Sequence, residues 1–569
     1  MKVVIIGGVA GGATAAARLR RLDEQAEIVI LEKGGFVSFA NCGLPYYIGG
    51  IIPERDDLLL QTPESFYRRF NIDVRVNQEA ISIDRATQVV GIRDLASGRE
   101  YTEPYDKLIL APGAKPNIPN VPGLDSAQVF TLRNIADTDS IRGFVDTTKP
   151  HHATIIGGGY IGIEMAESLM HAGVGVSIVQ RSNHVINAID FDMACQVHEH
   201  LRDKGVDLRL EAPFGGVREQ DDKLYVLLDS GSHGGGDADD GGRRDDGLGG
   251  EELATDLVIL AVGVHPDSQL AVDAGITVSG AGGIVVDEHM RTSDPNIYAV
   301  GDAVVVNDLV TGTPGQIPLA GPANRQGRIA ADNICGIPSR YTATQGSAVL
   351  KAFDLTIAAT GINERRAQAA GIAYDKVYLS PASHAGYYPG SSALSLKLLF
   401  SPENGRILGA QGVGLEGVDK RIDVLAVAIR AGMTAADLTE LELCYAPPFS
   451  SAKDPVNMAG YLIENVLAGR VRQYFWNEVA TLPRDGSAQL IDVRSFGEYQ
   501  QGSIEGFANI PLDELRARLG ELDCTKPVYL LCQSALRSYI AARILMQSGF
   551  AEVSHLAGGY RLYTMVSEQ

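Results

Sequence analysis

The sequence predicts an α/β protein of several domains, and three observations lead to that class. Residues 3–31 and 153–179 each contain an apolar strand, a glycine-rich turn, a helix and a second strand. Residues 345–465 mix strands and helices without such a turn, which is typical of an α+β domain. Residues 486–569 form a predicted small α/β unit with apolar strands at 489–493 and 527–531. The 569 residues leave room for these domains at ~150 residues each.

Composition and charge narrow the possible environment and partners. No apolar run reaches the ~18 residues of a membrane span, and the first residues form a strand, which is unlike a signal peptide. The net charge of −21 disfavours nucleic acid as a partner. Six cysteines without framework spacing fit a reducing compartment. We therefore expect a cytoplasmic protein that binds neither membranes nor nucleic acid.

Residues 229–252 are rich in glycine and acidic side chains and predict a disordered loop between two strands. Their aspartates and histidine lack the ordered ligand spacing of a calcium loop. We predict no metal site in the chain.

The first glycine turn follows the strand Val3–Ile6 and precedes a helix over 13–22. It departs from the G-x-G-x-x-G pattern at its middle position, which is Val9. Glu32 ends the next strand, at the place where an acid binds a ribose hydroxyl. Asp302 ends a later apolar strand and is expected to present its carboxylate to another ligand hydroxyl.

The second turn fits the dinucleotide pattern fully, with Gly157, Gly159 and Gly162 between a strand and a helix. Such glycines let the pyrophosphate approach the helix N-terminus closely. Gln180 and Arg181 stand where the ribose-binding acid would be. An arginine there accommodates the 2′-phosphate of NADPH, so the choice between NADH and NADPH stays open.

The order of these motifs, with Ala111-Pro112-Gly113 and Ala261-Val262-Gly263 between them, resembles the flavoprotein disulfide reductases over roughly residues 1–465. The resemblance implies FAD in the first site, NADH or NADPH in the second, and a homodimer. It implies domains at 1–146 with 262–325 (FAD), 147–261 (NAD(P)H), 326–465 (dimerisation), 466–485 (linker) and 486–569. The implied FAD residues are Gly7, Gly8, Gly12, Glu32, Lys33, Ala111, Gly113 and Asp302. The implied NAD(P)H residues are Gly157, Gly159, Gly162, Arg181 and Gly263.

Cys42 follows the first dinucleotide unit in the segment Ser38–Tyr47. Relatives of the glutathione reductase type carry a second cysteine five residues later, where this chain has Tyr47. A single cysteine must cycle through a mixed disulfide, a persulfide or a sulfenic acid. We expect the next segment to place Cys42 at a helix N-terminus, which would lower the pKa of its thiol.

Two single-cysteine branches of the family compete. Oxidases and peroxidases carry a histidine in the first turn, where this chain has Ala10. Residues 38–42, 349–354, 384–390 and 445–454 resemble coenzyme A-disulfide reductase instead. That resemblance implies a coenzyme A site with Lys453 from the partner subunit, and Tyr388 and Tyr445 as donors to a leaving thiolate. The other implied coenzyme A residues are Thr14, Arg18, Arg21, Ser38 and Asn41. A solvated basic face and ordinary interface tyrosines are the alternatives.

Segments at 490–494, 498–499, 502–504 and 509–512 resemble the rhodanese domain. Cys532 lies there between an apolar strand and a helix, in a loop that ends at Arg537. Loop N–H groups, the helix dipole and Arg537 would stabilise a thiolate or persulfide. We expect an active sulfur carrier, with a docking module as the alternative.

Together these features predict an FAD-dependent oxidoreductase. It would use NAD(P)H to reduce coenzyme A persulfide, polysulfide or coenzyme A disulfide through Cys42, with sulfane sulfur delivered by Cys532. Two alternatives stay open: an NAD(P)H oxidase working through a Cys42 sulfenate, and a slow-turnover sensor of sulfane sulfur.

Overall fold

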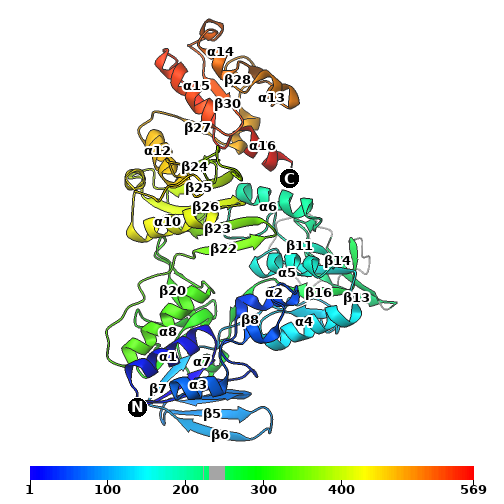
Figure 1. Ribbon diagram of the computed structural model, residues 1–569, viewed down its shortest axis with the longest axis vertical. Helices are drawn as coiled ribbons and strands as arrows, with labels where there is room; N and C mark the ends of the chain where they lie inside the picture. The colour runs from blue at the N-terminus through cyan, green and yellow to red at the C-terminus, as the bar shows by residue number, and fades with distance from the viewer. Residues whose placement is uncertain (222, 230–249, 569) are drawn as a thin grey trace, which may run out of the picture. The chain divides into compact units, whose positions relative to one another are not determined.

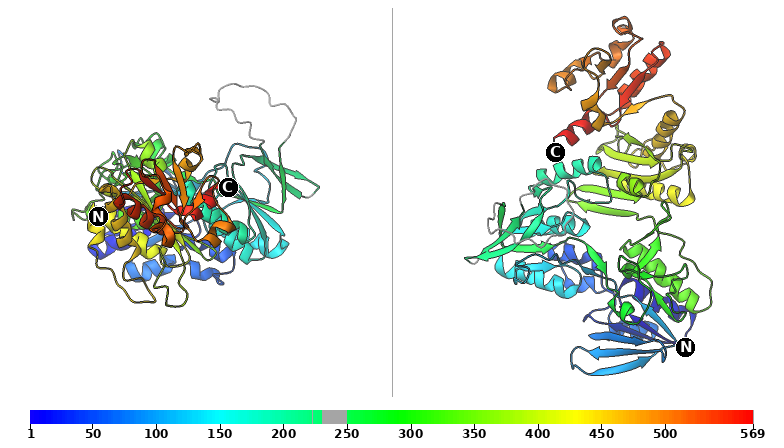
Figure 2. Two further views of the ribbon diagram at one scale, coloured as in Figure 1. Left: turned by 90° about the horizontal axis from the view of Figure 1, so that it is seen from above. Right: turned by 180° about the vertical axis from the view of Figure 1, so that it is seen from behind.

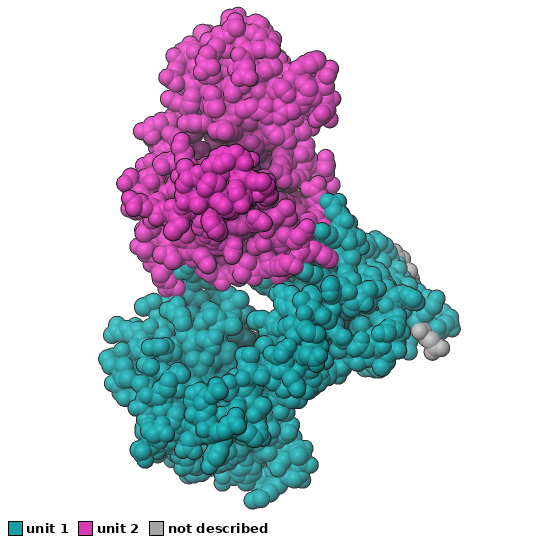
Figure 3. All heavy atoms as spheres, viewed as in Figure 1, with its two compact units in different colours: residues 1–186, 201–346 teal, residues 187–200, 347–569 magenta. Residues whose placement is uncertain are grey.

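The computed structural model describes residues 1–221, 223–229 and 250–568 (Figure 1). It divides into two compact units, Met1–Ile186 with Leu201–Gly346 and Asn187–His200 with Ser347–Gln569 (Figure 3). Across the described residues, no helix has both the length and the apolar character needed to cross a membrane.

The first glycine turn belongs to a five-stranded parallel sheet in the first unit, ordered β19-β7-β1-β2-β3. Its strands are β1 (Lys2–Ile6), β2 (Glu27–Glu32), β3 (Asp73–Val76), β7 (Lys107–Leu110) and β19 (Ile297–Ala299). Helix α1 (Ala10–Leu22) packs against α8 (Ala320–Ile334) so closely that a Cβ on Gly327 would lie 2.3 Å from the carbonyl oxygen of Gly11. Glycine at this crossing therefore sets the spacing of the two helices.

The second glycine turn belongs to another parallel sheet in the same unit, ordered β12-β11-β10-β16-β9. Its strands are β9 (Val129–Thr131), β10 (His152–Ile156), β11 (Gly175–Val179), β12 (Asp207–Arg209) and β16 (Leu257–Leu260), and α5 (Tyr160–His171) follows β10. The predicted boundary at residue 147 needs correction, because β9 pairs with β16 although it precedes that boundary.

Smaller elements complete the first unit. One antiparallel sheet contains β4 (Gln78–Asp84), β5 (Val89–Asp94) and β6 (Glu100–Pro104), and another contains β13 (Phe214–Gln220), β14 (Lys223–Leu228) and β15 (Glu252–Thr255). The remaining elements are α2 (Leu44–Ile48), α3 (Pro63–Phe70), α4 (Ile135–Thr148), α7 (Gln269–Asp273), β8 (Ala114–Pro116), β17 (Val264–Pro266), β18 (Ile284–Val285), β20 (Val304–Asn307) and β21 (Pro314–Gly315). The acidic segment 229–252 joins β14 to β15, and its residues 230–249 lie outside the described residues.

The second unit contains an antiparallel sheet ordered β22-β23-β26-β25-β24. Its strands are β22 (Ala348–Ala352), β23 (Leu355–Gly361), β24 (Asp375–Leu379), β25 (Leu394–Phe400) and β26 (Ile407–Gly414). Helices α10 (Val418–Ala431) and α12 (Pro455–Leu467) pack against it, as the right-hand view of Figure 2 shows. The helices α6 (Phe191–Asp203), α9 (Glu364–Ala369) and α11 (Ala435–Thr439) complete this region.

Cys532 belongs to a parallel sheet ordered β27-β31-β30-β28-β29, also in the second unit. Its elements are β27 (Gln473–Tyr474), β28 (Gln489–Asp492), α13 (Phe496–Gln501), β29 (Ala508–Asn509), α14 (Leu512–Leu515), β30 (Val528–Leu531), α15 (Leu536–Gln547), β31 (Val553–Leu556) and α16 (Gly559–Ser567). The predicted linker 466–485 needs correction, because β27 pairs with β31 and the Tyr474 hydroxyl donates to the carbonyl of Leu530. The part of the predicted linker from β27 onward therefore belongs to the C-terminal domain, whereas residues 466 and 467 end α12.

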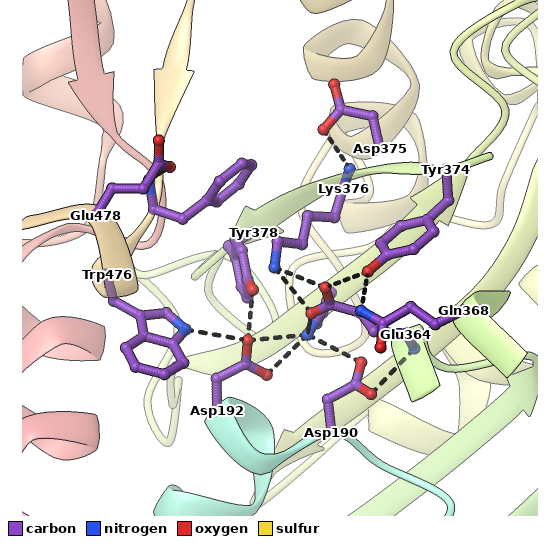
Figure 4. A network of polar contacts seen from close by, with 12 residues as sticks. Asp190, Asp192, Glu364, Gln368, Tyr374, Asp375, Lys376, Tyr378, Trp476 and Glu478 are labelled. Atoms are coloured by element: carbon purple, nitrogen blue, oxygen red, sulfur yellow. Dashed lines mark hydrogen bonds and ion pairs between the residues drawn. The ribbon is translucent and has the colours of Figure 1, made fainter. Parts of the chain in front are cut away.

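A buried ion network lies where α6 begins in the second unit (Figure 4). The Lys397 Nζ is 2.9 Å from the nearest carboxylate oxygen of Asp190, 2.8 Å from that of Asp192 and 2.5 Å from that of Glu364. The Trp476 indole donates to Asp192 at 3.4 Å. Three carboxylates this close could hold a metal ion, but the ammonium group already occupies the space between them.

Candidate active site

Both glycine turns have the same local construction. In the first, Gly7 has a φ of +95°, and a Cβ there would lie 2.1 Å from the Ala111 carbonyl oxygen. A Cβ on Gly12 would lie 1.9 Å from the Gly7 carbonyl oxygen. The Gly8 amide donates to the Glu32 carboxylate at 2.8 Å. The turn is therefore closed by backbone contacts that only glycine permits, with an acid at its edge.

The second turn repeats this arrangement with an amide in place of the acid. Gly157 has a φ of +108°, and a Cβ on Gly162 would lie 2.0 Å from the Gly157 carbonyl oxygen. The Gly158 amide donates to the Gln180 side-chain oxygen at 2.9 Å. A Cβ on Gly159 would meet no atom within 4 Å, so the middle of the turn is open to a ligand. This is the cradle that a pyrophosphate needs at a helix N-terminus.

The remaining predicted nucleotide residues lie around these turns in the first unit. The Arg133 guanidinium is 3.0 Å from the Asp302 carboxylate, and a Cβ on Gly113 would lie 2.9 Å from that guanidinium. Gly263 has a φ of +99° just beyond β16. Lys33 is exposed and pairs with Glu79 at 2.8 Å, and Arg181 is exposed beside Gln180.

The first site fits FAD by its donors and acceptors. The Gly8 and Gly34 amides both donate to Glu32 at 2.8 Å, and burial raises the pKa of this carboxyl. An acid held in this way is placed to accept a hydrogen bond from a ribose hydroxyl. Asp302 offers a second carboxylate just after β19.

Cys42 lies in a single helical turn, Asn41–Gly43, directly before α2. The Ser38 amide donates to the Gly8 carbonyl at 2.8 Å, so the cysteine segment is tied to the first glycine turn. Ser38 has a φ of +48° and both Ser38 and Asn41 are partly buried, whereas Cys42 is exposed.

The charges around Cys42 correct the predicted direction of its pKa. Partial burial raises the pKa of the thiol, and the nearby carboxylates of Glu164 and Asp302 raise it further. Arg133 offsets only part of this. The predicted lowering therefore fails for the chain's own residues, because burial is the largest influence on this pKa and the two acids add to it.

Glu164 is a site residue that the sequence interpretation missed. It lies on α5, two residues after Gly162, and accepts a hydrogen bond from the Tyr46 hydroxyl at 3.3 Å. Burial raises the pKa of Glu164 to about 7. The helix of the second turn thus brings a titratable carboxyl beside the cysteine of the first. The sequence signal for it is weak, because α5 also carries Glu167, Ser168 and His171.

Replacing Glu164 with glutamine is expected to lower the pKa of the Cys42 thiol, because ionised Glu164 is one of the charges that raise it. The measurement is the rate of Cys42 alkylation across pH, followed by peptide mass spectrometry. Glu54→Gln, at an exposed position of the same unit, is the matched control. It should leave the pH midpoint of the Cys42 alkylation rate unchanged. A midpoint that rises or stays in place in Glu164→Gln contradicts this role.

The predicted basic face of α1 is divided between structural and exposed groups. Arg18 forms an ion pair with Asp332 of α8 at 2.7 Å, and Thr14 donates to Asn324 at 2.7 Å. Arg21 is exposed in the last turn. Of the two arginines, Arg21 is therefore the one presented to solvent, and Arg18 already has an acidic partner.

The two tyrosines predicted to donate to a leaving thiolate, Tyr388 and Tyr445, both lie in the second unit and contact different neighbours. Tyr445 bonds to the hydroxyl of Tyr387 at 2.9 Å, and both are exposed. Tyr388 instead packs edge-on against His384 with the ring centroids 5.7 Å apart. The hydrogen bond to Tyr445 raises the pKa of the Tyr387 hydroxyl. Lys453 is exposed in the same unit.

Cys532 directly follows β30 and is fully buried, and α15 begins four residues later. The first N–H groups of a helix have no intrahelical acceptor, so the loop and α15 offer donors near the sulfur. Ala535, in the middle of this loop, has a φ of +73°. Arg537 forms two hydrogen bonds with Glu498, at 2.7 and 2.6 Å, and lowers the pKa of that carboxyl to about 2.

Comparison with known proteins agrees with this geometry. The profile of the pyridine nucleotide-disulphide oxidoreductases matches residues 1–327, that of their dimerisation domain matches 347–455, and that of the rhodanese-like domain matches 476–565. Coenzyme A disulfide reductase of Staphylococcus epidermidis is 36% identical over 461 residues, which cover 81% of this chain and 99% of that protein.

Two solved structures match almost the whole chain. The reduced CoADR-RHD of Bacillus anthracis is 47% identical with a TM-score of 0.94, over 100% of this chain and 98% of that one. An NAD-dependent persulfide reductase from A. fulgidus is 37% identical with a TM-score of 0.90, over 99% and 100% of the two chains. These matches confirm the predicted fold class, the FAD- and NAD(P)H-dependent oxidoreductase class and the rhodanese-like domain. The chain belongs to the pyridine nucleotide-disulphide oxidoreductase family.

Proposed function

We propose that this protein is a cytoplasmic homodimer that uses NAD(P)H to reduce coenzyme A persulfide, polysulfide or coenzyme A disulfide through Cys42. The main support for this proposal is the presence of two single-cysteine sites in one chain. Cys42 lies beside the two nucleotide turns, and Cys532 lies at the start of a helix in a rhodanese-like domain. Similarity to coenzyme A disulfide reductases supports the disulfide substrate, and similarity to a persulfide reductase supports the persulfide substrate.

The chemistry at Cys42 follows from its having no second cysteine nearby, since Tyr47 stands five residues on. The Cys42 thiolate attacks one sulfur of coenzyme A disulfide, forms a mixed disulfide and releases coenzyme A thiolate. With coenzyme A persulfide it attacks the inner sulfur and releases hydrosulfide. Glu32 and Asp302 would hold FAD, which would supply two electrons taken from NAD(P)H for the reduction of this mixed disulfide. Cys42 then leaves as thiolate, and coenzyme A takes up a proton and departs as thiol.

Coenzyme A needs cations for its phosphates and donors for its leaving sulfur. Arg21 and Lys453 are exposed and supply positive charge, and Tyr388 and the Tyr387–Tyr445 pair offer hydroxyl donors. Lys453 and the tyrosines would come from the partner subunit of a homodimer, in line with the matched dimerisation domain.

The rhodanese-like domain would transfer sulfane sulfur from a polysulfide to coenzyme A. The Cys532 thiolate attacks the terminal sulfur of a polysulfide, forming a Cys532 persulfide and a shortened chain. The thiolate of coenzyme A then attacks the outer sulfur of that persulfide, which restores Cys532 and yields coenzyme A persulfide for Cys42.

Anaerobic oxidation of NADH and NADPH with coenzyme A persulfide, polysulfide and coenzyme A disulfide tests the proposal. Faster turnover on the sulfane substrates supports a sulfur reductase with a delivery domain. Preference for the disulfide makes it a thiol-redox enzyme with an accessory domain. Failure on all three, with oxygen consumption in air, would replace the proposal with the oxidase. Failure on all three without oxygen consumption would favour the sensor.

Replacing Cys532 with serine is expected to slow turnover with polysulfide while sparing reduction of added coenzyme A persulfide. Serine cannot carry sulfane sulfur, whereas preformed coenzyme A persulfide bypasses the delivery step. Cys524→Ser, an exposed cysteine of the same domain, is the matched control. Equal loss with both substrates would count against delivery by Cys532.

Replacing Arg181 with alanine is expected to reduce kcat/KM for NADPH about tenfold while changing that for NADH little. Arginine at this place offers charge-assisted bonds to a 2′-phosphate that NADH lacks. Steady-state kinetics with both nucleotides measure the ratio. A similar loss for both nucleotides would mean that Arg181 supports the turn without recognising the phosphate.

A further inference from the structure

Ser538 and His555 form a polar pair behind Cys532, inside the core of the C-terminal domain. The Cys532 Sγ lies 3.4 Å from the Ser538 Oγ, which lies 3.2 Å from the His555 Nδ1. Cys532 and Ser538 are 0% exposed and His555 is 1% exposed. The three side chains come from the end of β30, from α15 and from β31. They form one continuous chain of hydrogen bonds that ends at the cysteine.

The hydrogen bonds of Ser538 fix the protons of this chain. Its hydroxyl donates to the Ala535 carbonyl at 3.0 Å, which leaves two lone pairs as acceptors. One lone pair accepts from the Cys532 thiol, and the other accepts from the His555 Nδ1. Burial lowers the pKa of His555 to about 4, so the ring is neutral. With the Ser538 hydroxyl proton directed to the Ala535 carbonyl, the bond between Ser538 and His555 assigns the ring proton to Nδ1.

Histidine at position 555 also lowers the stability of the fold relative to an apolar residue. Its Nε2 is buried and has no hydrogen-bond partner within the described part of the chain. An unpartnered polar atom in a core costs free energy that an apolar side chain would not. Packing alone would favour leucine, so the hydrogen bond that Nδ1 makes is the feature that only a polar side chain provides.

We propose that Ser538 and His555 are positioning residues for the sulfur anion of Cys532. When the thiol releases its proton to solvent, or when the persulfide forms, the Ser538 hydroxyl rotates from the Ala535 carbonyl to the sulfur and becomes its donor. The His555 Nδ1–H keeps its bond to the Ser538 oxygen and holds it in place. The rotation needs no movement of heavy atoms. The inference rests on the proposed role of Cys532 as a sulfur carrier.

Other titratable groups also face this sulfur. Arg537 of α15 and Tyr474 of β27 interact with the charge of Cys532, and Asp492 of β28 is paired with Arg494. They remain unchanged when Ser538 or His555 is replaced. A difference between variants therefore reports the hydrogen-bond chain and not the surrounding charges.

The test is alkylation of Cys532 in the full-length holoenzyme with iodoacetamide. Peptide mass spectrometry gives the rate of alkylation at a series of pH values. Ser538→Ala should move the midpoint of the rate upward by about one pH unit, which is about a tenfold loss of rate at neutral pH. Ser538→Thr keeps the hydroxyl and should restore the midpoint. His555→Leu should move it upward by less, and His555→Asn, which keeps a donor near the position of Nδ1, should restore it.

Cys524, exposed in the same domain, is the internal reference for the reagent. Rates that change by one constant factor at every pH, or midpoints that do not move in Ser538→Ala, would overturn the proposal and leave a packing role. The conservative variants keep the test valid if the alanine or leucine variant fails to fold. Alkylation does not require turnover, so a failure of sulfur delivery by the enzyme would not change these midpoints.

Discussion

Replacing Cys42 with serine is expected to lower NAD(P)H-dependent reduction of coenzyme A disulfide and persulfide by about 10³-fold or more. No second cysteine lies where the dithiol relatives carry one, so the disulfide formed during turnover must join Cys42 to the substrate. A serine hydroxyl cannot form that bond and is a far weaker nucleophile than a thiolate. The measurement is anaerobic nicotinamide oxidation, followed by its absorbance, at several pH values.

The control separates loss of the thiol from loss of the nucleotide sites. Cys42→Ser should still pass electrons from NAD(P)H to an artificial one-electron acceptor, because both glycine turns lie outside the substitution. Cys444→Ser, at another exposed cysteine, should keep full activity with both sulfur substrates. Reduction of coenzyme A disulfide by Cys42→Ser at more than a few per cent of the wild-type rate would assign the chemistry to another group.

The features that sequence patterns predicted well are local ones. The two glycine turns depend on contacts within one strand-turn-helix segment, and the closures at Gly12 and Gly162 follow from that spacing. Glu164 could not be predicted in the same way, because the fold brings α5 of the second nucleotide unit beside Cys42. The predicted direction of the Cys42 pKa shift was wrong for a related reason, since both the burial of the thiol and the nearby acids depend on the tertiary fold.

Short elements account for the corrected boundaries. The strand β9 has three residues and β27 has two, too few for an alternating pattern to stand out. Pairing with β16 and β31 decides where they belong. The tyrosine pairing shows the same limit, because Tyr387 and Tyr388 are adjacent and only the loop conformation decides which hydroxyl meets Tyr445.

Replacing Lys397 with methionine is expected to lower the free energy of unfolding by about 3–5 kcal/mol, because it leaves buried carboxylates without their main cation. Lys397 is 0% exposed and contacts Asp190, Asp192 and Glu364. Trp476 is the only tryptophan of the chain and donates to Asp192, so its fluorescence during denaturant unfolding reports this network. Lys115→Met, which removes a half-exposed pair with Asp267, should cost less than about 1 kcal/mol.

The pH dependence of this loss distinguishes charge from packing. Burial raises the pKa of Asp192 and Glu364, but Lys397, together with Lys376 and the Tyr378 hydroxyl, outweighs it and both pKa values are lowered. These acids therefore stabilise the wild type above their ordinary pKa values, and that contribution is lost as the pH falls through the lowered values. The pKa of Lys397 is raised, so its contribution is fully present at neutral pH and is lost as the pH rises from the ordinary pKa of lysine through the raised one.

Without Lys397, burial is still opposed in part by Lys376 at both carboxyls and by the Tyr378 hydroxyl at Asp192. The pKa of both carboxyls should nevertheless rise relative to the wild type, so the variant should lose less stability than the wild type as the pH falls toward about 4. The difference between wild type and Lys397→Met should then narrow at acidic pH. Adding Asp192→Asn to Lys397→Met removes one of the stranded charges and should recover part of the loss at neutral pH. A loss that is constant with pH, and that the second substitution deepens, would mean that Lys397 acts by filling space and that the network is not held by its charge.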